Sequence, residues 1–456
     1  MNLGHIKNIH FVGIGGIGMS GIAEILKSHD LVISGCDLKP SSVTERLEKR
    51  GIPVAIGHSG DHLGAADLLV ISSAVKSNNA EVLAARAGHV PVIRRAEMLG
   101  EIMRLKKSVA IAGTHGKTTT SAMTAAVLAS LDPTLIVGGV MRDIATNAQL
   151  GKGDLLVVEA DEYDRSFLVL FPTIAAITNI EADHLDCYAD LDDIKRAFLE
   201  FASRVPFYGL VIGCGDDQNV AALLDEVSKP VMSYGLSASA DLRASEIRFT
   251  ESGSDFLVTL QGNALGRVTL GVPGEHNVRN ALAAIGVALE VGLPFSEASR
   301  ALAAFHGVER RFQILGEHAG ATIVDDYAHH PTEIRATLEA ARRSYPDRRI
   351  IALFQPHLFS RTRDFFGDFA DAFQSADVAF VSPIYAAREE PLEGVSTRMI
   401  TDAAARKGRS NVKLLDLHND EIVRHLDGFL TKGDVLITMG AGDINKVGLA
   451  LVGRAA

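Results

Sequence analysis

The stretch that most constrains this chain places a glycine turn between a buried strand and the start of a helix. Residues 109–112 are predicted to form the strand, and Gly113 and Gly116 interrupt its apolar pattern. Glycines let the backbone close around a phosphate group, and the free N–H groups at a helix start attract anions. In that layout Lys117 would reach the terminal phosphates of a nucleotide, and the hydroxyl of Thr118 would bind Mg²⁺. The stretch therefore predicts a nucleotide-phosphate site.

The phosphate motif is incomplete, because Ile111 occupies a position where a full Walker A motif has glycine. An ordinary glycine turn, between the strand and an Ala-rich helix predicted over residues 121–131, is therefore the alternative interpretation. The preceding strand and the consecutive threonines at positions 118–120 favour phosphate binding.

The composition and charge of the chain limit its partners and its compartment. The 456 residues carry a net charge of −11 and contain no Lys/Arg-rich run, which argues against nucleic acid and anionic membranes as main partners. No apolar run approaches the length that spans a bilayer, so we expect no membrane insertion. The three cysteines, Cys36, Cys187 and Cys214, are far apart, which predicts a reducing cytoplasm and no disulfide framework. The length predicts about three domains.

A second glycine-rich turn lies near the N-terminus. Gly13, Gly15 and Gly18 follow a strand predicted over residues 7–12, and Asp37 ends the next predicted strand. This spacing is the dinucleotide-binding fingerprint, in which the acid contacts a ribose hydroxyl. The motif requires only that a diphosphate binds at this helix start, so NAD and any other nucleotide diphosphate remain open.

Polar side chains also follow other predicted strands, at the edge where α/β sheets bind ligands. Ser72 and Ser73 follow a strand in the first third, although plain turn chemistry explains them equally well. Glu159 follows a buried strand beside the phosphate stretch, where Mg²⁺-binding acids are usually found. His184 follows the next strand, and its role stays open because imidazole is an uncommon ligand for Mg²⁺.

The last third of the chain alternates predicted strands and helices, which indicates a further parallel α/β sheet. Its strand ends hold many His, Arg, Asp and Tyr side chains, which a binding site explains better than separate capping roles. These residues are Arg310, Arg311, Asp325, Asp326, Tyr327, His329, His330, His357 and Arg361. A shorter set at the start of another predicted helix comprises His276, Asn277 and Asn280.

Taken in chain order, these motifs resemble the Mur ligases of bacterial cell-wall synthesis over nearly the whole chain. The first and fourth motifs favour the alanine-adding branch of that family. The motifs are Gly13–Gly21, Gly113–Thr119, Glu159–Glu162, Thr178–His184, His276–Asn277, Arg310–Phe312, Asp325–Tyr327, His329–Glu333 and Phe354–His357.

The resemblance implies an α/β fold with three domains. Residues 1–107 would form an N-terminal Rossmann-like domain for a UDP-sugar, and residues 108–312 a central P-loop ATPase-type domain with a mixed sheet. Residues 313–456 would form a C-terminal Rossmann-like domain for the amino acid and ATP. The implied enzyme is a cytoplasmic monomer or homodimer. It would phosphorylate the carboxylate of UDP-N-acetylmuramate with ATP, and the amine of L-alanine would attack the acyl phosphate.

The resemblance also assigns roles to individual residues. The expected catalytic residues are Lys117, Glu159, His184 and Arg311, and the expected Mg²⁺ ligands are Thr118, Glu159 and His184. The expected ATP-binding residues are Gly113, Thr114, His115, Gly116, Lys117, Thr118, Thr119, His276, Asn277, Asn280, Arg311 and Asp326. The expected UDP-sugar-binding residues are Gly13, Gly15, Gly16, Gly18, Asp37, Ser72 and Ser73. The expected amino-acid-binding residues are Tyr327, His329, His330 and Arg361.

Arg361 is the predicted partner of the amino acid's carboxylate, because a planar guanidinium group matches a carboxylate. Many members of the resembled family have arginine directly after the Gln-Pro-His motif, where this chain has Leu358. Arg361 is therefore expected to hold the carboxylate alone. A surface position on a helix is the alternative for this residue.

Four other functions are alternatives to the alanine-adding ligase. A sibling ligase that attaches recycled peptide, or a folylpolyglutamate synthetase, would share the same motifs. The glycine turn that ends at Gly18, together with Asp37, would also suit an NAD-dependent oxidoreductase. A non-catalytic binding protein is disfavoured, because Lys117, Glu159 and His184 are all present.

Overall fold

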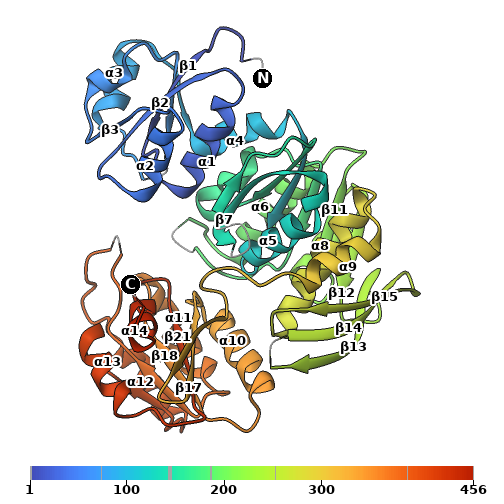
Figure 1. Ribbon diagram of the computed structural model, residues 1–456, viewed down its shortest axis with the longest axis vertical. Coiled ribbons are helices and arrows are strands. Elements are labelled where there is room, and N and C mark those ends of the chain that lie inside the picture. The colour runs from blue at the N-terminus through green and yellow to red at the C-terminus, as the bar shows by residue number, and fades with distance from the viewer. Residues whose placement is uncertain are drawn as a thin grey trace. The chain divides into compact units, whose positions relative to one another are not determined.

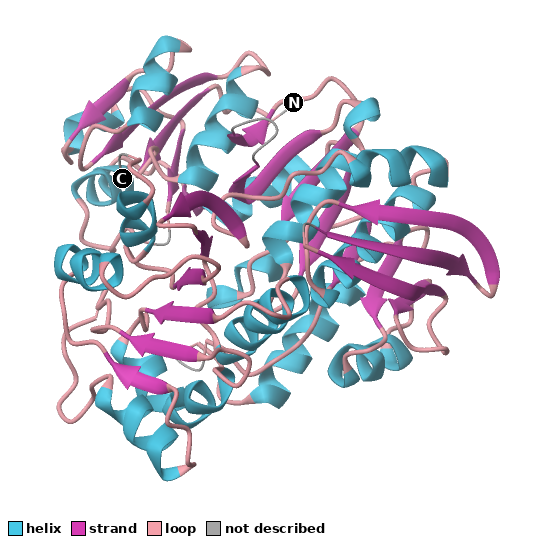
Figure 2. Ribbon diagram, turned by 60° about the horizontal axis from the view of Figure 1, so that its bottom comes forward, coloured by secondary structure: helices cyan, strands magenta, loops and turns pink. Residues whose placement is uncertain are grey.

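Three β-sheets flanked by helices form the protein, as the computed structural model shows for residues 3–72, 74–141, 146–184, 187–251, 253–387 and 389–454 (Figures 1 and 2). The chain packs into two compact units. The first comprises Met1–Arg243, Val258–Gly266 and Arg279–Ala301, and the second Ala244–Leu257, Arg267–Val278 and Leu302–Ala456. Within the described ranges, no helix combines the length and the apolar character needed to cross a bilayer.

The first sheet has five parallel strands in the order β3-β2-β1-β4-β5. Its strands are β1 (Asn8–Val12), β2 (Val32–Asp37), β3 (Val54–Ile56), β4 (Leu68–Ile71) and β5 (Val92–Arg94). Its helices are α1 (Ile17–Lys27), α2 (Ser42–Lys49), the short η1 (Gly60–Leu63), α3 (Ala80–Ala87) and α4 (Arg95–Met103). The strand order reverses between β1 and β4, which is where open α/β sheets bind ligands. The glycine turn after β1 lies at this point.

The second sheet has ten strands in the order β15-β14-β13-β12-β11-β10-β6-β9-β7-β8. Its strands are β6 (Lys107–Ala112), β7 (Thr134–Met141), β8 (Thr146–Gln149), β9 (Leu155–Glu159), β10 (Ile174–Ile177), β11 (Leu210–Cys214), β12 (Val231–Gly235), β13 (Leu242–Thr250), β14 (Gly253–Leu260) and β15 (Asn263–Leu270). The helices of this part are α5 (Lys117–Val127), η2 (Ala129–Leu131), η3 (Tyr163–Val169), α6 (Leu191–Ser203), α7 (Gln218–Glu226), α8 (Glu275–Glu290) and α9 (Phe295–Ala303).

The second sheet is mixed, as predicted. Strands β6, β9, β10, β11 and β12 pair in parallel, whereas β8 runs antiparallel to β7. Two-residue connections join β13 to β14 and β14 to β15, and connections of this length require antiparallel neighbours. The apolar side chains of β6 and β10 are fully buried, because helices cover both faces of a parallel sheet.

The third sheet has six strands in the order β16-β17-β21-β18-β19-β20, all parallel except β16. Its strands are β16 (Gln313–His318), β17 (Ala321–Asp326), β18 (Ile350–Phe354), β19 (Val378–Val381), β20 (Val412–Leu414) and β21 (Val435–Met439). Its helices are α10 (Pro331–Ser344), α11 (Phe359–Ala372), α12 (Arg398–Arg406), α13 (Asn419–Asp427) and α14 (Asn445–Leu451). The predicted α/β class, with a Rossmann-like sheet at each end of the chain and a mixed sheet between them, is confirmed.

The helix after the phosphate stretch begins earlier than predicted. The structure starts α5 at Lys117 and ends it at Val127, whereas residues 121–131 were expected. A first turn rich in threonine has low helix propensity, but the preceding Gly116 adopts a left-handed conformation (φ 81°) and turns the chain directly into the helix. Lys117 and Thr118 therefore stand in the first helical turn, where N–H groups are free.

The hydrophobic core of the first unit is continuous from the first sheet to the second. Ile22 of α1 and Met98 of α4 belong to the same buried cluster as Phe167 and Phe198. The ring of Phe167 lies 5.1 Å from that of Phe198, edge to face, and 5.0 Å from that of Phe201, stacked. These aromatic contacts fix α6 against η3, and η3 follows the acidic segment after β9.

We predict that Phe198→Ala lowers the free energy of unfolding by about 3–5 kcal/mol, because the cavity left in a close-packed core is only partly refilled. Urea denaturation followed by circular dichroism measures this change. Phe207→Ala is the matched control, because Phe207 is 83% exposed, and it should change the stability by less than about 0.5 kcal/mol. Equal effects of the two substitutions would contradict the assigned core.

Candidate active site

The glycine loop after β6 is braced by residues at the end of the neighbouring strand β10. The hydroxyl of Thr178 donates to the carbonyl oxygen of His115 at 2.6 Å, and the side-chain oxygen of Asn179 accepts from the backbone N–H of His115 at 2.8 Å. Gly113 has φ 133°, and a Cβ there would lie 2.0 Å from the hydroxyl oxygen of Thr178. The close approach of the two segments therefore requires glycine and fixes the loop before any ligand binds.

The far side of the glycine loop contacts α8. A Cβ on Gly116 would lie 2.9 Å from the side-chain oxygen of Asn280, which is itself buried. Thr114 is fixed by its backbone N–H, which donates to the carbonyl oxygen of Asn179 at 3.0 Å. Thr119 is buried within the first turns of α5. The structure therefore brings Asn280 to the predicted phosphate loop.

The other two residues of the predicted α8 set lie at the start of that helix. The side-chain amide of Asn277 donates to the carbonyl oxygen of Pro273 at 2.6 Å, and this side chain is buried. His276 packs closely on Gly274, where a Cβ would lie 2.5 Å from its ring. Asn277 thus stabilises the turn that leads into the helix.

Lys117 is the first residue of α5, and its ammonium group is turned back into the glycine loop. The Nζ atom donates to the carbonyl oxygens of Gly113 and Thr114, at 2.6 and 3.1 Å, and to the two carboxylate oxygens of Glu162, at 2.9 and 2.7 Å. Burial opposes the charge of the lysine, but the carboxylates of Glu162 and Asp161 outweigh it and raise the pKa of Lys117. The lysine is therefore a fixed positive charge inside the loop.

Glu159, the last residue of β9, contacts the start of α5. Its Oε1 atom accepts from the hydroxyl of Thr118 at 3.0 Å, and its Oε2 atom accepts from the backbone N–H of Gly138 at 2.8 Å. Burial raises the pKa of Glu159. A carboxylate beside a hydroxyl is the oxygen-rich ligand set that Mg²⁺ prefers, and a dication would favour the ionised carboxylate. The structure thus brings two of the three predicted Mg²⁺ ligands together.

His184, the third predicted Mg²⁺ ligand, is paired with the carboxylate that also binds Lys117. Its Nε2 atom lies 3.4 Å from Oε1 of Glu162 and 3.8 Å from Oδ2 of Asp183. Burial disfavours the charged imidazole ring, but the two carboxylates outweigh burial and raise the pKa of His184. The backbone at His184 has φ 55°, a left-handed conformation that is uncommon outside glycine and is often found at functional sites.

The glycine turn after β1 is stabilised by the acid of its own motif. The backbone N–H of Gly15 donates to Oδ2 of Asp37 at 2.8 Å, and a Cβ on Gly15 would lie 2.8 Å from the same oxygen. Gly13 has φ 78°, and a Cβ there would lie 3.0 Å from the hydroxyl oxygen of Ser72. Asp37 therefore fixes the turn as well as facing the space beside it.

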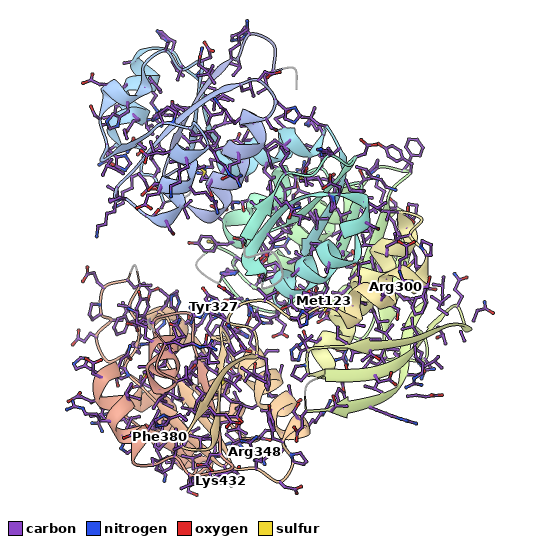
Figure 3. All side chains as sticks on the ribbon, in the orientation of Figure 1. Met123, Arg300, Tyr327, Arg348, Phe380 and Lys432 are labelled. Atoms are coloured by element: carbon purple, nitrogen blue, oxygen red, sulfur yellow. The ribbon has the colours of Figure 1, made fainter. Side chains whose placement is uncertain are left out.

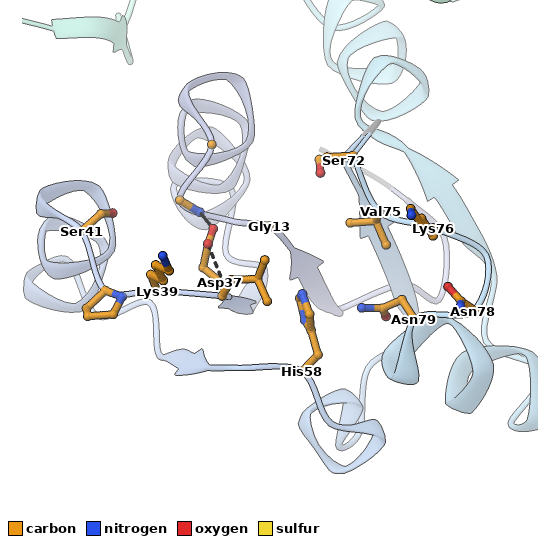
Figure 4. Close-up of a pocket in the computed structure, with 15 residues that line it drawn as sticks. Gly13, Asp37, Lys39, Ser41, His58, Ser72, Val75, Lys76, Asn78 and Asn79 are labelled. Atoms are coloured by element: carbon orange, nitrogen blue, oxygen red, sulfur yellow. Dashed lines mark hydrogen bonds between the residues drawn. The ribbon is translucent and has the colours of Figure 1, made fainter. Parts of the chain in front are cut away.

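A pocket of about 670 Å³ opens beside this turn, at the carboxyl ends of β1, β2 and β4 (Figure 4). Figure 4 shows Lys39 and Ser41 on one side, Lys76 and Asn79 on the other, and His58 between them. The predicted residues among its lining are Gly13, Gly15, Gly16, Asp37 and Ser72. Two lysines and the starts of α2 and α3 make the pocket suitable for an anionic ligand.

One predicted residue of the UDP-sugar set, Gly18, does not line this pocket. It packs against Arg95, whose Nη1 atom would lie 2.8 Å from a Cβ at this position. Gly18 thus allows close packing between α1 and α4 within the first unit. Ser73 lies outside the described residues.

In the second unit, Tyr327 follows β17 (Figure 3). Its ring lies against two arginines. The guanidinium carbons of Arg310 and Arg311 lie 5.0 and 5.1 Å from the centre of the tyrosine ring, within the range of cation–π attraction. Arg311 also lies 3.7 Å from the carboxylate of Glu333. The Arg-Arg pair and Tyr327 therefore lie side by side in the second unit.

The side chain of Asp326 forms a hydrogen bond with the backbone of the segment that carries Arg311. Its carboxylate accepts from the backbone N–H groups of Phe312 and Ala328, at 2.8 and 2.7 Å. Burial raises the pKa of Asp326 to about 6. The carboxylate thus joins the segment before β16, which carries Arg311, to the segment after β17, which carries Tyr327.

Two of the predicted amino-acid-binding residues, Tyr327 and His329, are in ring contact with each other, whereas His330 packs on a different ring. The ring of His329 lies 5.2 Å from that of Tyr327 and 6.0 Å from that of His357, and its Nδ1 atom is 3.0 Å from the carbonyl oxygen of Tyr327. The ring of His330, at the start of α10, lies 5.0 Å from that of Phe365 in α11.

Arg361 lies in the first turn of α11 and is 8% exposed, so the surface alternative for this residue is wrong. The preceding Leu358 has φ 72°, a left-handed conformation that turns the chain sharply into α11. A branched residue in this conformation is strained, and the surrounding structure must hold it. The backbone around the predicted carboxylate partner is therefore tightly specified.

Sequence reasoning missed several residues that the structure places in these sites. Glu162 was noticed only as part of an acidic run, and its spacing of three from Glu159 gave no indication that it would bind Lys117. Thr178 braces the glycine loop from another strand, and the pairing of β6 with β10 could not be read from the sequence. Lys39 and Lys76 are ordinary surface residues by pattern, and only the fold places both at the pocket.

Three segments match descriptions of known protein families. Residues 8–107 match the catalytic domain of the Mur ligase family, residues 111–288 the Mur ligase middle domain, and residues 310–442 the glutamate ligase domain of Mur ligases. Together these segments cover most of the chain.

Curated proteins and solved structures show the same similarity over the full length. A UDP-N-acetylmuramate–L-alanine ligase of Pelobacter propionicus is 51% identical over 452 residues, which cover 98% of each chain. The structure of a UDP-N-acetylmuramate–alanine ligase from Thermotoga maritima has a TM-score of 0.80 and 31% identity, and covers 98% of this chain and 99% of its own. A murein peptide ligase from Psychrobacter arcticus has a TM-score of 0.70 and 27% identity, with 99% of each chain covered. This chain belongs to the Mur ligase family.

Proposed function

We propose that this chain joins L-alanine to the carboxylate of UDP-N-acetylmuramate, with conversion of ATP to ADP and phosphate, in the synthesis of peptidoglycan precursors. The single observation that carries the proposal is a preformed phosphate loop with a buried Lys117, in a chain 51% identical over its full length to a UDP-N-acetylmuramate–L-alanine ligase. The ATP-dependent chemistry belongs to the family, and the choice of alanine rests on the relatives.

The chemistry explains why the site needs charge rather than a protein nucleophile. A carboxylate is a poor acyl donor until one of its oxygens carries a phosphoryl group. The γ-phosphoryl group of ATP moves to that oxygen, ADP leaves, and the neutral amine of alanine then attacks the acyl carbon. The C–N bond forms, the C–O bond to phosphate breaks, and the amine loses a proton. Both transfers depend on positioning and on stabilisation of developing negative charge.

In our proposal, residues in and beside the second sheet have separate roles in binding phosphate and Mg²⁺. Lys117 neutralises charge on the transferred phosphoryl group. Asn280, which belongs to α8, supports the glycine loop. Thr118 and Glu159 hold Mg²⁺, with His184 acting directly or through water, and bound Mg²⁺ would neutralise charge on the phosphates. The contact between Thr118 and Glu159 at 3.0 Å supports this assignment.

The pocket of the first sheet suits the UDP-sugar in our proposal. The glycine turn after β1 allows close approach of a diphosphate, and Lys39 and Lys76 supply positive charge at opposite sides. NAD would satisfy the same turn, so the preference for a UDP-sugar rests on the family. The proposed domain boundaries remain 1–107, 108–312 and 313–456. We place the reaction in the cytoplasm, where ATP and nucleotide sugars are available.

The amino acid is assigned to the second unit, where Arg361 would bind its carboxylate and Tyr327 and His329 would contact it. His330 and Asp326 complete the expected set, with Asp326 on the ribose of ATP. The buried position of Arg361 and the ring contact between Tyr327 and His329 support this proposal.

Phosphate release tests the function directly. We expect release from ATP only when UDP-N-acetylmuramate and L-alanine are both present, with one UDP-N-acetylmuramoyl-alanine formed for each phosphate. The tripeptide L-alanyl-γ-D-glutamyl-diaminopimelate should support phosphate release in place of L-alanine only if the chain is a peptide-recycling sibling. ATP turnover that ignores the UDP-sugar, or a fluorescence change with NADH but not with UDP-N-acetylmuramate, would overturn the proposal.

Lys117→Ala should lower the turnover number by a factor of about 10²–10³, because it removes positive charge at the transferred phosphate. The KM for UDP-N-acetylmuramate should stay near its normal value, because the sugar pocket belongs to the first sheet. Turnover is measured by coupled ADP detection at saturating substrates.

A second variant separates catalysis from folding at this position. Lys117→Ala leaves the buried carboxylate of Glu162 without its lysine partner and with only the longer contact to His184, which destabilises the fold. The double variant Lys117→Ala with Glu162→Gln removes the charge of that carboxylate, so it should recover thermal stability but not turnover. Lys195→Ala, on the exposed face of α6, is the control. Normal turnover in the double variant would remove Lys117 from catalysis.

Arg361→Ala should raise the KM for L-alanine by about tenfold or more and leave the KM for ATP and for the UDP-sugar nearly unchanged. Arg361→Lys should recover only part of the loss, because an ammonium group does not reproduce the planar pair of donors. Arg363→Ala is the matched control, because Arg363 lies in the same helix with a 55% exposed side chain. An unchanged alanine KM in both Arg361 variants would place the carboxylate elsewhere.

A further inference from the structure

A cluster of metal-ligating side chains in the first unit belongs to none of the sites above. Cys36 lies near the end of β2, His58 in the loop before η1, His62 within η1, and Glu81 in the first turn of α3. Cys36, His62 and Glu81 each place one ligand atom within 4.8 Å of the other two. Cys36 and Glu81 are fully buried, whereas the side chains of His58 and His62 are 24% and 23% exposed.

The side chains of Cys36, His58 and His62 converge on one carboxylate oxygen of Glu81. Oε1 of Glu81 lies 3.1 Å from Sγ of Cys36, 3.2 Å from Nδ1 of His58 and 3.2 Å from Nδ1 of His62. The sulfur is also 3.5 Å from Nδ1 of His58. The same Oε1 atom accepts from the backbone N–H of Ser59 at 3.0 Å.

A network of hydrogen bonds alone accounts poorly for this arrangement. A carboxylate oxygen offers two lone pairs, yet four potential donors approach Oε1. The other oxygen, Oε2, is buried, and none of the residues that the structure describes donates to it. Donors that only satisfied a buried carboxylate would be shared between its two oxygens, because an unpaired buried oxygen is unfavourable. The convergence instead matches ligands that surround a common centre.

We propose that Cys36, His62 and Glu81, with His58 beside them, form a binding site for a transition-metal ion, with Zn²⁺ as the best match. Zinc bonds of about 2.0–2.3 Å in a tetrahedron separate neighbouring ligand atoms by about 3.3–3.6 Å. Four separations in the cluster, at 3.1–3.5 Å, are close to these values, and the ligand atoms of Cys36 and His62 lie within 4.8 Å of each other. A thiolate with imidazoles and a carboxylate selects Zn²⁺ over Mg²⁺, which prefers oxygen ligands. The partly exposed histidines provide the entry path.

The ion would brace the wall of the UDP-sugar pocket. Cys36 directly precedes Asp37, which lines the pocket and bonds to Gly15. His58 itself lines the pocket, and Glu81 lies two residues after Asn79, which faces the same space (Figure 4). Zinc would therefore tie β2, η1 and α3 together around the pocket. This site is separate from the proposed Mg²⁺ site at Thr118 and Glu159.

Cobalt titration of the full-length protein, after treatment with a chelator, tests the site. Co²⁺ replaces Zn²⁺ in such sites, and a thiolate ligand gives a charge-transfer absorption in the near ultraviolet. We expect one Co²⁺ per chain with this absorption, and loss of the absorption when Zn²⁺ is added. Zn²⁺ should also raise the melting temperature of the metal-free protein, because it binds only the folded state. Absence of the absorption and of the temperature shift would overturn the proposal.

Variants show whether the cluster holds the ion. Cys36→Ser should abolish the charge-transfer absorption, and His62→Gln should weaken Zn²⁺ binding by about tenfold or more. His62 lies on a partly exposed short helix, so its variant keeps the proposal testable if the buried Cys36 variant fails to fold. Cys187→Ser is the matched control and should keep the absorption and the temperature shift. Loss of the absorption only in Cys187→Ser, which lies three residues after His184, would place the ion at the ATP site and overturn the proposal.

Discussion

A buried ion pair between Lys117 and Glu162 joins the segments that make up the phosphate loop. The lysine belongs to the first turn of α5, the glutamate to the segment after β9, and His184, from the end of β10, contacts the same carboxylate. Taking two charges out of water is unfavourable, so such a pair persists only with close geometry and further hydrogen bonds. The carbonyl oxygens of Gly113 and Thr114 supply them. A phosphate that reaches Lys117 therefore meets a charge already desolvated and oriented, which is the condition for strong electrostatic stabilisation.

The two glycine turns of the first unit are held in place by side chains of opposite charge. Each follows a central strand whose neighbours run parallel to it, and each opens a helix. The turn after β1 is held by a carboxylate, Asp37, whose oxygen accepts from the backbone N–H of Gly15. The turn after β6 is held by a cation, Lys117, and by the polar side chains of Thr178 and Asn179. At the first turn, the positive charge comes from Lys39 and Lys76 on the walls of the pocket. This arrangement suits binding of a substrate that does not react at its phosphates. The second keeps its cation inside the loop, which suits transfer of a phosphoryl group.

Several buried carboxylates in the first unit each join two or more segments of the chain. Glu159, Glu162 and Glu81 each lie at a strand end or a helix start and each contacts groups from two or more segments. Removing any one of them leaves donors unpaired in several elements at once, because the groups it binds are distant in sequence. The glycine loop after β6 and the wall of the pocket beside β1 therefore depend on the packing of the sheets, and the continuous core around Phe167 and Ile22 supplies that packing.

The sequence by itself determined the α/β class, the order of strands and helices, and both glycine turns, because these follow from local patterns of apolar residues and glycine. It also indicated that Lys117, Glu159 and Asp37 lie at strand ends or helix starts. Only the tertiary structure decided their partners. Glu162 binds Lys117, Asp37 fixes Gly15, and Arg361 is buried rather than on the surface. These contacts join residues 22 to 45 positions apart or depend on packing between helices. Spacing along the chain cannot specify them, since they arise from which strands become neighbours in the folded sheets.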